Sequence, residues 1–200
     1  MKSYHITLGI LALFLLVSFP GAHDRVTWWL EVFPIFLAAP VVWHFGRSGR
    51  LSPFLQGVIV FHALILCIGG HYTYALAPPG EWVRDLGIGM RNNYDKLGHF
   101  MQGVTPVIAI REILMRQNRW EPNTGFMATL AVLAAGGISA VYKVVEMIAA
   151  LVMGGGADAF LGTQGFVWDT QTDMATALVG ALFAVLLFSK THLRSMTASE

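Results

Sequence analysis

Residues 125–153 read GFMATLAVLAAGGISAVYKVVEMIAALVM, an apolar stretch whose only charged residues are Lys143 and Glu146. A helix of about 20 apolar residues is long enough to cross the roughly 30 Å of hydrocarbon in a bilayer. The stretch therefore predicts a membrane-spanning helix, and it decides the class of the whole protein.

The rest of the chain has the same apolar character. Of its 200 residues, 55% are hydrophobic and 12% are charged, whereas soluble domains carry roughly 25% charged residues. The formal net charge is +1 and the basic residues are dispersed, so we expect no nucleic acid as a partner. Cys67 is the single cysteine, which excludes an internal disulfide and a cysteine-based zinc cluster.

Five further apolar stretches accompany the first. The predicted spans are His5–Phe19, Leu30–Phe45, Pro53–Tyr74, Leu97–Met115, Gly125–Met153 and Asp169–Phe188. We therefore expect an all-α fold, a polytopic transmembrane helical bundle of about six spans that forms a single integral membrane domain over residues 1–200. The first, second and fourth spans are short, so we expect them to stand nearly upright or to lie in thinned bilayer.

The first span has an alternative interpretation as a cleaved signal peptide. Lys2 would be its basic n-region, but Pro20-Gly21-Ala22 matches a small-residue cleavage site poorly.

Basic residues alternate between the connecting segments and predict the orientation. One set of segments carries Lys2, Arg47, Arg50, Arg111, Arg116, Arg119, Lys190 and Arg194. The opposite segments, 20–30, 75–96 and 154–168, carry no basic excess. The positive-inside rule then predicts that both termini are cytoplasmic and that the opposite segments are extracytoplasmic.

Ionisable residues gather near the predicted extracytoplasmic ends of the spans. These residues are His71, Asp95, Lys96, His99, Lys143, Glu146, Asp169 and Asp173. Charge in or near hydrocarbon is costly and by default indicates a functional site. The inner halves of the spans look apolar except for His44 and His62, which favours a site on one side of the membrane.

The start of the fourth span is the densest chemical segment. Asn92-Asn93 suits a turn or helix cap, and Asp95, His99 and Gln102 share one helix face. An aspartate and a histidine one turn apart can bind one metal, or the aspartate can orient the histidine as a general base. The alternative is that Asp95 only favours the helix dipole while His99 bonds a neighbouring helix.

Two further pairs of charged residues lie one turn apart. Lys143 and Glu146 share a face with Ser139, and they can either serve a site or simply neutralise each other. Asp169 and Asp173 are i and i+4, where like charges repel. A bound cation, a basic neighbour or one shared proton would relieve that repulsion.

The remaining polar features are weaker. His71 lies close to the interface and is a candidate ligand, whereas we expect His62 to make an interhelical hydrogen bond. The glycine-rich loop at 154–165 follows no strand, so it predicts close backbone approach and not a phosphate-binding P-loop.

Three segments carry a resemblance to a known family. They are YDKLGHFMQG at 94–103, YKVVE at 142–146 and FLGTQGFVWDTQTDM at 160–174. Through these segments the sequence resembles the YjdF family of bacterial inner-membrane proteins, and the resemblance extends along most of the chain from the second span onward. The family is functionally uncharacterised, so the resemblance implies a helical membrane fold and an inner-membrane location but no reaction.

A more distant pattern is similar to the VanZ-like superfamily, some of whose members are linked to glycopeptide-antibiotic tolerance. The matching residues are Asp95, Lys96, His99, Phe100, Glu146, Gln164 and either Asp169 or Asp173. This sequence differs in having Tyr142-Lys143 before the glutamate and Asp173 where an asparagine is expected.

Three hypotheses for function follow. The first is a membrane enzyme acting on a lipid or envelope phosphate. Its catalytic candidates are His99, Asp95 and Glu146, its substrate-binding candidates are Arg91, Lys96, Lys143 and Gln164, and its metal ligands are His71, His99, Glu146, Asp169 and Asp173. The carboxylates suit Mg²⁺ or Mn²⁺, and adding His71 suits Zn²⁺. The basic residues would hold an anionic headgroup.

The second hypothesis is a transporter or lipid-binding protein with an ion or proton relay. The third is a structural hydrogen-bond lock in a protein that acts through a partner. A polar path continuing to the cytoplasmic face would favour transport.

Overall fold

The computed structural model describes residues 3–117, 124–154, 158–161 and 163–197, and every regular element in these ranges is helical. The long helices are α1 (Ser3–Ser18), α2 (Arg25–Arg47), α3 (Pro53–Tyr72), α5 (Tyr94–Arg116), α6 (Gly125–Met153) and α8 (Asp169–Phe183). The short elements are the 3₁₀ turn η1 (Tyr74–Leu76), α4 (Pro78–Asp85), α7 (Asp158–Leu161), the π-helical turn η3 (Ala184–Phe188) and α9 (Ser189–Thr197). The prediction of an all-α membrane bundle is confirmed.

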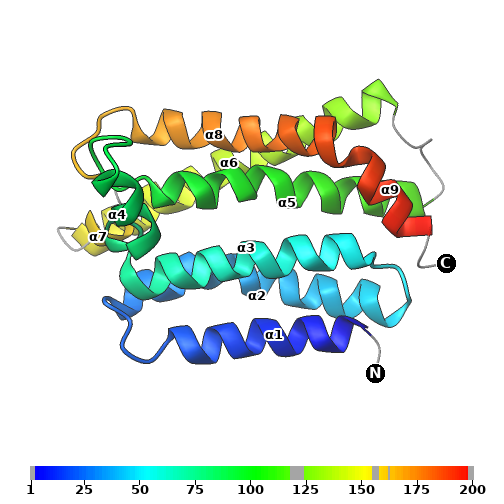
Figure 1. Ribbon diagram of the computed structural model, residues 1–200, viewed down its shortest axis with the longest axis horizontal. Helices are drawn as coiled ribbons and strands as arrows, with labels where there is room; N and C mark the ends of the chain where they lie inside the picture. The colour runs from blue at the N-terminus through cyan, green and yellow to red at the C-terminus, as the bar shows by residue number, and fades with distance from the viewer. Residues whose placement is uncertain (1–2, 118–123, 155–157, 162, 198–200) are drawn as a thin grey trace.

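The long helices run side by side along the long axis of the molecule (Figure 1). Within the described residues, α2, α3, α6 and the continuous stretch Asp169–Thr197 are long and apolar enough to cross a membrane. The helix α1 is apolar but shorter. The helix α5 matches α2 in length, with 23 residues each, but carries charged residues near both of its ends. About six spans therefore remains an approximate count.

The second and fourth spans are not short. The helices α2 and α5 extend beyond the predicted spans because their end turns carry polar residues that an apolar criterion leaves out. At about 1.5 Å per residue, each is long enough for the hydrocarbon core without thinning of the bilayer.

The helices form two three-helix halves. In one half α1, α2 and α3 pack together, in the other α5, α6 and α8 pack together, and α3 against α5 forms the seam between the halves. Figure 1 shows α2 behind α3 and α6 behind α5. The helices α2 and α6 thus lie on the same side of the seam, with a gap between them. The helix α7 contacts both α2 and α6 at one end of this gap.

Small residues set the closest helix contact. A Cβ at Gly103 of α5 would lie 1.9 Å from the Ala177 carbonyl oxygen, and one at Gly180 of α8 would lie 2.1 Å from the Phe100 carbonyl oxygen. Side chains larger than hydrogen would force these backbones apart. The helix α6 contains a run of small residues at 134–140, and a Cβ at Gly136 within it would lie 2.9 Å from the Leu178 side chain of α8.

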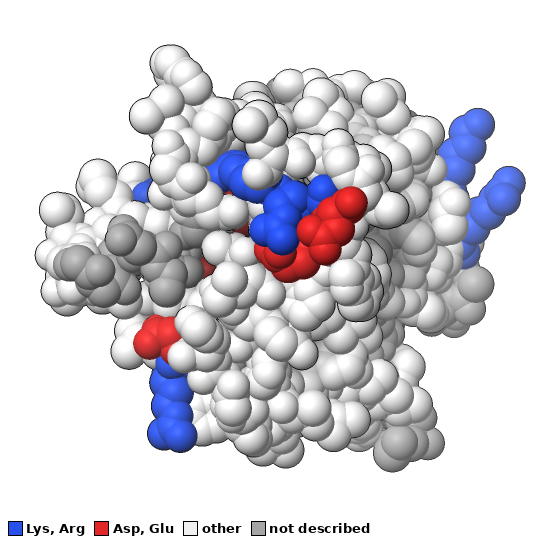
Figure 2. Space-filling model, turned by 60° about the vertical axis from the view of Figure 1, so that its left-hand side comes forward, with Lys and Arg blue, Asp and Glu red and all other residues white. Residues whose placement is uncertain are grey.

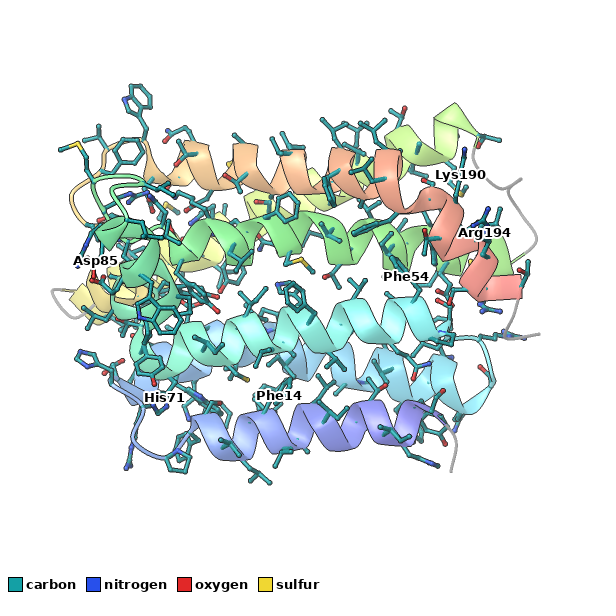
Figure 3. All side chains as sticks on the ribbon, viewed as in Figure 1. Phe14, Phe54, His71, Asp85, Lys190 and Arg194 are labelled. Carbon is teal, nitrogen blue, oxygen red and sulfur yellow. The ribbon has the colours of Figure 1, made fainter. Side chains whose placement is uncertain are left out.

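The bundle has two distinct ends. We call the end with α4 and α7 the outer end, and the end where the chain termini lie the inner end (Figure 1). Figure 3 shows His71 and Asp85 at the outer end and Lys190 and Arg194 at the inner end. Two basic residues that support the predicted orientation, Lys2 and Arg119, lie outside the described residues.

Candidate functional site

Asp173 is the centre of a buried ionic network at the outer end. Its side chain is 1% exposed, and its Oδ2 lies 2.5 Å from Lys143 Nζ and 3.2 Å from His99 Nε2. Its Oδ1 accepts a hydrogen bond from the Lys96 ammonium. Three helices, α5, α6 and α8, therefore contribute to one cluster.

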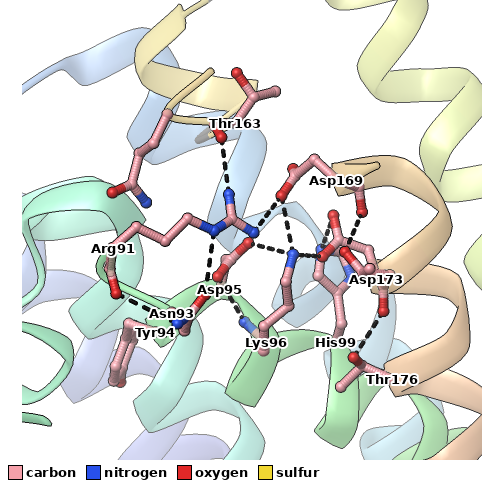
Figure 4. Close-up of polar contacts among 12 residues, drawn as sticks. Arg91, Asn93, Tyr94, Asp95, Lys96, His99, Thr163, Asp169, Asp173 and Thr176 are labelled. Atoms are coloured by element: carbon pink, nitrogen blue, oxygen red, sulfur yellow. Dashed lines mark hydrogen bonds and ion pairs between the residues drawn. The ribbon is translucent and has the colours of Figure 1, made fainter. Parts of the chain in front are cut away.

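Lys96 links the three aspartates of this network (Figure 4). Its Nζ lies 2.9 Å from Asp95 Oδ2 and 2.9 Å from Asp169 Oδ1, and it also bonds Asp173. Arg91 adds a second cation, with one guanidinium nitrogen 2.7 Å from Asp169 and another 2.8 Å from the Thr163 carbonyl oxygen. Basic neighbours, one of the three predicted solutions, thus relieve the repulsion between Asp169 and Asp173.

The same geometry bears on the predicted metal. One oxygen each of Asp95, Asp169 and Asp173 lies within 4.8 Å of the others, a spacing that suits a hard cation. However, the Lys96 ammonium already lies within hydrogen-bond distance of all three carboxylates. These residues therefore do not fit a resident divalent metal, because the lysine occupies the position where the ion would bind.

The helix α6 presents one buried stripe to its neighbours. Its buried residues are Met127, Ala131, Ala135, Ser139, Lys143 and Glu146. The stripe confirms that Ser139, Lys143 and Glu146 share a face, and Lys143 Nζ lies 2.5 Å from Glu146. Lys143 therefore contacts two carboxylates, those of Glu146 and Asp173.

Of the two interpretations of Asp95 and His99, the structure agrees with the second, in which His99 bonds a neighbouring helix. The Asp95 carboxylate bonds Lys96, both at the backbone N–H and at the ammonium. His99 instead lies between Gln102, whose Oε1 is 3.0 Å from Nδ1, and Asp173. Asp173, which comes from another helix, is thus the carboxylate that orients His99.

Gln164 links two outer loops. Its Nε2 donates to the Asn92 carbonyl oxygen at 2.7 Å, and its Oε1 accepts from the Asn92 N–H at 3.3 Å. The Asn92 side chain is itself 1% exposed and accepts from the Tyr94 N–H at the start of α5. Asn93 is the N-cap residue of α5 but makes no side-chain cap hydrogen bond, whereas Asn92 forms the expected turn, and Gln164 holds the loop that carries Arg91.

The other predicted histidines lie apart from this network. His71 Nδ1 lies 2.8 Å from the Ser18 carbonyl oxygen, so it joins α3 to the loop after α1. Within the described residues, His62 makes no hydrogen bond to another helix, which corrects the expectation for it; it lines a cavity instead. The structure does not bring His71 to His99, Glu146, Asp169 and Asp173.

A cavity of about 390 Å³ lies in the gap between α2 and α6. Apolar side chains from both helices line it, among them Phe33, Leu37, Ile138 and Val141, which are 45–64% exposed on the bundle surface. Its polar lining comprises Glu31, His62, Tyr74, Asp95, His99, Gln102, Thr105, Tyr142, Lys143 and Glu146. The cavity thus has an apolar side near the lipid and an ionisable side against the network.

Sequence reasoning missed Glu31, Tyr74 and Tyr142. Glu31 is 4% exposed, and a lone glutamate within an apolar span was the signal that could have found it. The Tyr74 side chain lies in the space left by two glycines: a Cβ at Gly69 would lie 2.5 Å from its ring, and one at Gly98 would lie 3.1 Å from its hydroxyl oxygen. The two glycines therefore let this tyrosine enter the seam between α3 and α5.

A second buried polar network lies at the inner end. Glu112 is 1% exposed and accepts from the Ser52 N–H at 2.6 Å and the Ser52 hydroxyl at 2.5 Å. It also lies 3.0 Å from Arg116 Nε and 2.9 Å from His192 Nε2. The prediction that the inner halves lack polar groups other than His44 and His62 is therefore wrong.

The surface of the outer end is of mixed sign. Figure 2 looks toward this end, where basic and acidic side chains gather in one patch surrounded by mostly uncharged surface. On α4, Arg84 contacts both Glu81 and Asp85 in partly exposed ion pairs. This face therefore carries no basic surface that would attract anions by its charge alone.

Comparison with known proteins gives a consistent result. A family model described as "Predicted membrane protein (DUF2238)" matches residues 3–194. The chain is 43% identical over 199 residues to the inner membrane protein YjdF of Escherichia coli (strain K12), covering 98% of this chain and 94% of that protein. No solved structure matches the chain.

Proposed function

Because this chain belongs to the DUF2238 family of predicted membrane proteins, and so is a multi-pass inner membrane protein, we propose that it binds a single-chain amphiphile. The ligand would lie in the cavity between α2 and α6 and present its polar group to the ionic network, which would do acid–base work on it. The observation that carries the proposal is the cavity itself, because it joins apolar, lipid-facing walls to buried ionisable groups.

The dimensions and chemistry of the cavity suit an amphiphile. A volume of about 390 Å³ falls within the range of ligand pockets, roughly 300–1,000 Å³. Exposed apolar residues such as Leu37 and Val141 belong to the lining of the cavity. An alkyl chain can therefore enter the cavity from the bilayer without crossing the polar surface of the protein. A ligand that was polar throughout would gain little from these walls.

The roles of the polar residues follow from their positions. His99, Lys143 and Glu146 line the cavity, so they are the groups that would touch the ligand. Asp173 contacts His99 and Lys143 but is not part of the lining, so we assign it a positioning role. His99 and Glu146 are our candidates for proton transfer, because both are titratable and face the cavity.

A continuous relay across the membrane is less well supported. The cavity lining on α5 ends at Pro106, and Glu112 of the inner network lies beyond it on the same helix. Between them Val107 and Ile108 are fully buried and apolar. A proton or ion crossing this layer would have no polar partner there.

We also propose that the outer end faces the extracytoplasmic side and that both termini are cytoplasmic. Support comes from the basic residues Arg47, Arg50, Lys190 and Arg194, which lie at the inner end, as the positive-inside rule requires of a cytoplasmic end.

Photolabelling in membranes tests the proposed function. A dodecyl amphiphile with a terminal diazirine should label peptides of α2 and α6 that line the cavity. Ala38→Trp, which places an indole in the cavity wall, should remove this labelling, whereas Val144→Trp, on the lipid-facing side of α6 and outside the lining, should not. Labelling spread over all lipid-facing helices and unchanged by Ala38→Trp would reject the cavity as the binding site.

A further inference from the structure

Glu31 is the carboxylate that the ionic network does not neutralise. It enters the cavity wall from α2, opposite the half that carries the network, and is 4% exposed. Tyr74, Asp95 and Glu146 line the same cavity. Among the described residues, no ion pair joins Glu31 to a lysine, arginine or histidine, and Lys143, which lines the same cavity, pairs with Glu146 and Asp173.

The cations of the outer end are already engaged. Arg91 contacts Asp169, Lys96 contacts three aspartates, and Lys143 contacts Glu146 and Asp173. With histidine taken as neutral, the buried carboxylates of the outer end are Glu31, Asp95, Glu146, Asp169 and Asp173, and the cations that pair with this buried set are Arg91, Lys96 and Lys143. Five negative groups against three positive groups leave an excess of two carboxylates. A buried charge without a partner is strongly unfavourable.

The cavity surface shows the same excess more directly. Its charged lining residues are Glu31, Asp95, Glu146 and Lys143, and the one ammonium among them is paired with Glu146. An anionic headgroup placed here would meet uncompensated carboxylates and would have to displace an existing ion pair. A cationic headgroup would instead supply the missing charge, and its N–H groups would find carboxylate acceptors.

We propose that the amphiphile bound in this cavity carries an amine headgroup, and that Glu31 is the residue that pairs with it. This inference rests on the proposed function and narrows its ligand class. It replaces the sequence-based expectation of an anionic headgroup held by Arg91, Lys96 and Lys143. The amine lies between α2 and α6, so Glu31 on one half of the bundle and Glu146 on the other would contact the same group.

Competition in the photolabelling experiment tests the headgroup. Protein in zwitterionic phosphatidylcholine vesicles is labelled in the presence of dodecylamine, dodecanol or dodecyl phosphate, which share one chain length. The amine is protonated at neutral pH, since such groups have pKa values near 10. We expect dodecylamine to suppress cavity labelling at the lowest concentration, and dodecyl phosphate to be the weakest competitor.

The variant Glu31→Gln tests recognition of the headgroup separately from binding of the alkyl chain. This variant should lose the preference for dodecylamine over dodecanol while cavity labelling itself persists, whereas Asp85→Asn, at an exposed position of α4 outside the cavity lining, should keep the preference. Thermal unfolding of both variants checks that they are folded. A preference for dodecyl phosphate, or a preference for the amine that survives Glu31→Gln, would overturn the inference and leave the proposed function standing. No competition by any of the three would overturn the proposed function as well.

Discussion

The two ends of this bundle contain buried ionic networks of opposite design. At the inner end, one carboxylate, Glu112, receives donors from Ser52, Arg116 and His192, and neither Glu112 nor His192 belongs to the lining of the cavity between α2 and α6. At the outer end, carboxylates outnumber cations and several of them line the cavity. A carboxylate with a full set of donors stabilises a fold, whereas one that lacks a cation and faces a cavity is suited to bind something.

The largest expected effect comes from replacing Glu112 at the inner end. Glu112→Gln keeps the size of the side chain but leaves Arg116 and His192 without their carboxylate. We expect a loss of about 3–5 kcal/mol in the free energy of unfolding, the range for breaking a buried pair. Denaturant titration of the purified protein in detergent micelles measures it.

Glu31→Gln at the outer end is the matched change. Because it removes a buried charge that has no cationic partner, we expect it to be neutral or stabilising. If the free energy of unfolding fell by a similar amount in both variants, the distinction between Glu112, which has a full set of donors, and Glu31, which lacks a cation, would be wrong.

The variant Lys96→Met removes the cation shared by three aspartates. We expect it to lose less free energy of unfolding than Glu112→Gln does. The Lys96 side chain is 19% exposed, so solvent screens part of the effect, and we expect about 2 kcal/mol. Millimolar Mg²⁺ should restore part of this stability, since the three carboxylates would then be free to bind it.

Two controls sharpen this prediction. Wild-type protein should show no response to Mg²⁺, and Lys190→Met, at an exposed inner position, should neither destabilise nor create such a response. A wild-type protein stabilised by Mg²⁺ as strongly as the variant would show that Lys96 does not take the place of a metal.

The smallest effect is expected from Gln164→Ala, which removes two hydrogen bonds to the Asn92 backbone. Because Gln164 is exposed, we expect about 1 kcal/mol, confined to the outer loops. Hydrogen exchange at residues 91–93 should quicken while exchange around Glu112 stays unchanged. Gln171→Ala, on the exposed side of α8, is the control, and a change at both ends of the bundle would contradict the separation of the two networks.

Helical periodicity accounts for the part of the fold and site that could be predicted. Residues one turn apart necessarily share a face, so Lys143 with Glu146 and Asp169 with Asp173 could be placed together from spacing alone. The apolar stretches likewise predicted the all-α bundle, because a long run without charge has few other structures available in a membrane.

The partners between helices could not be predicted in this way. Spacing gives the face of each helix but not the neighbour it meets, so it left open whether His99 bonds Asp95 or another helix, and it could not name Asp173 of α8 as the partner of His99. Glu112 stands between Arg111 and Arg116 at the end of its span, and this local sequence does not reveal that it meets Ser52 and His192 from other segments. Glu31 stands alone in its span, and nothing local indicates that it faces a cavity.

The position of Lys96 has a consequence for how the protein is made. A site built around a metal ion stays incomplete until the cell delivers that ion, and it empties when the ion is scarce. Here the positive charge is attached to the chain, so the outer network is assembled as soon as α5 and α8 meet, whatever the metal content of the medium. A homologue without this lysine would have to lose one of the aspartates or bind a cation to balance the charge. We therefore expect these positions to change together among homologues.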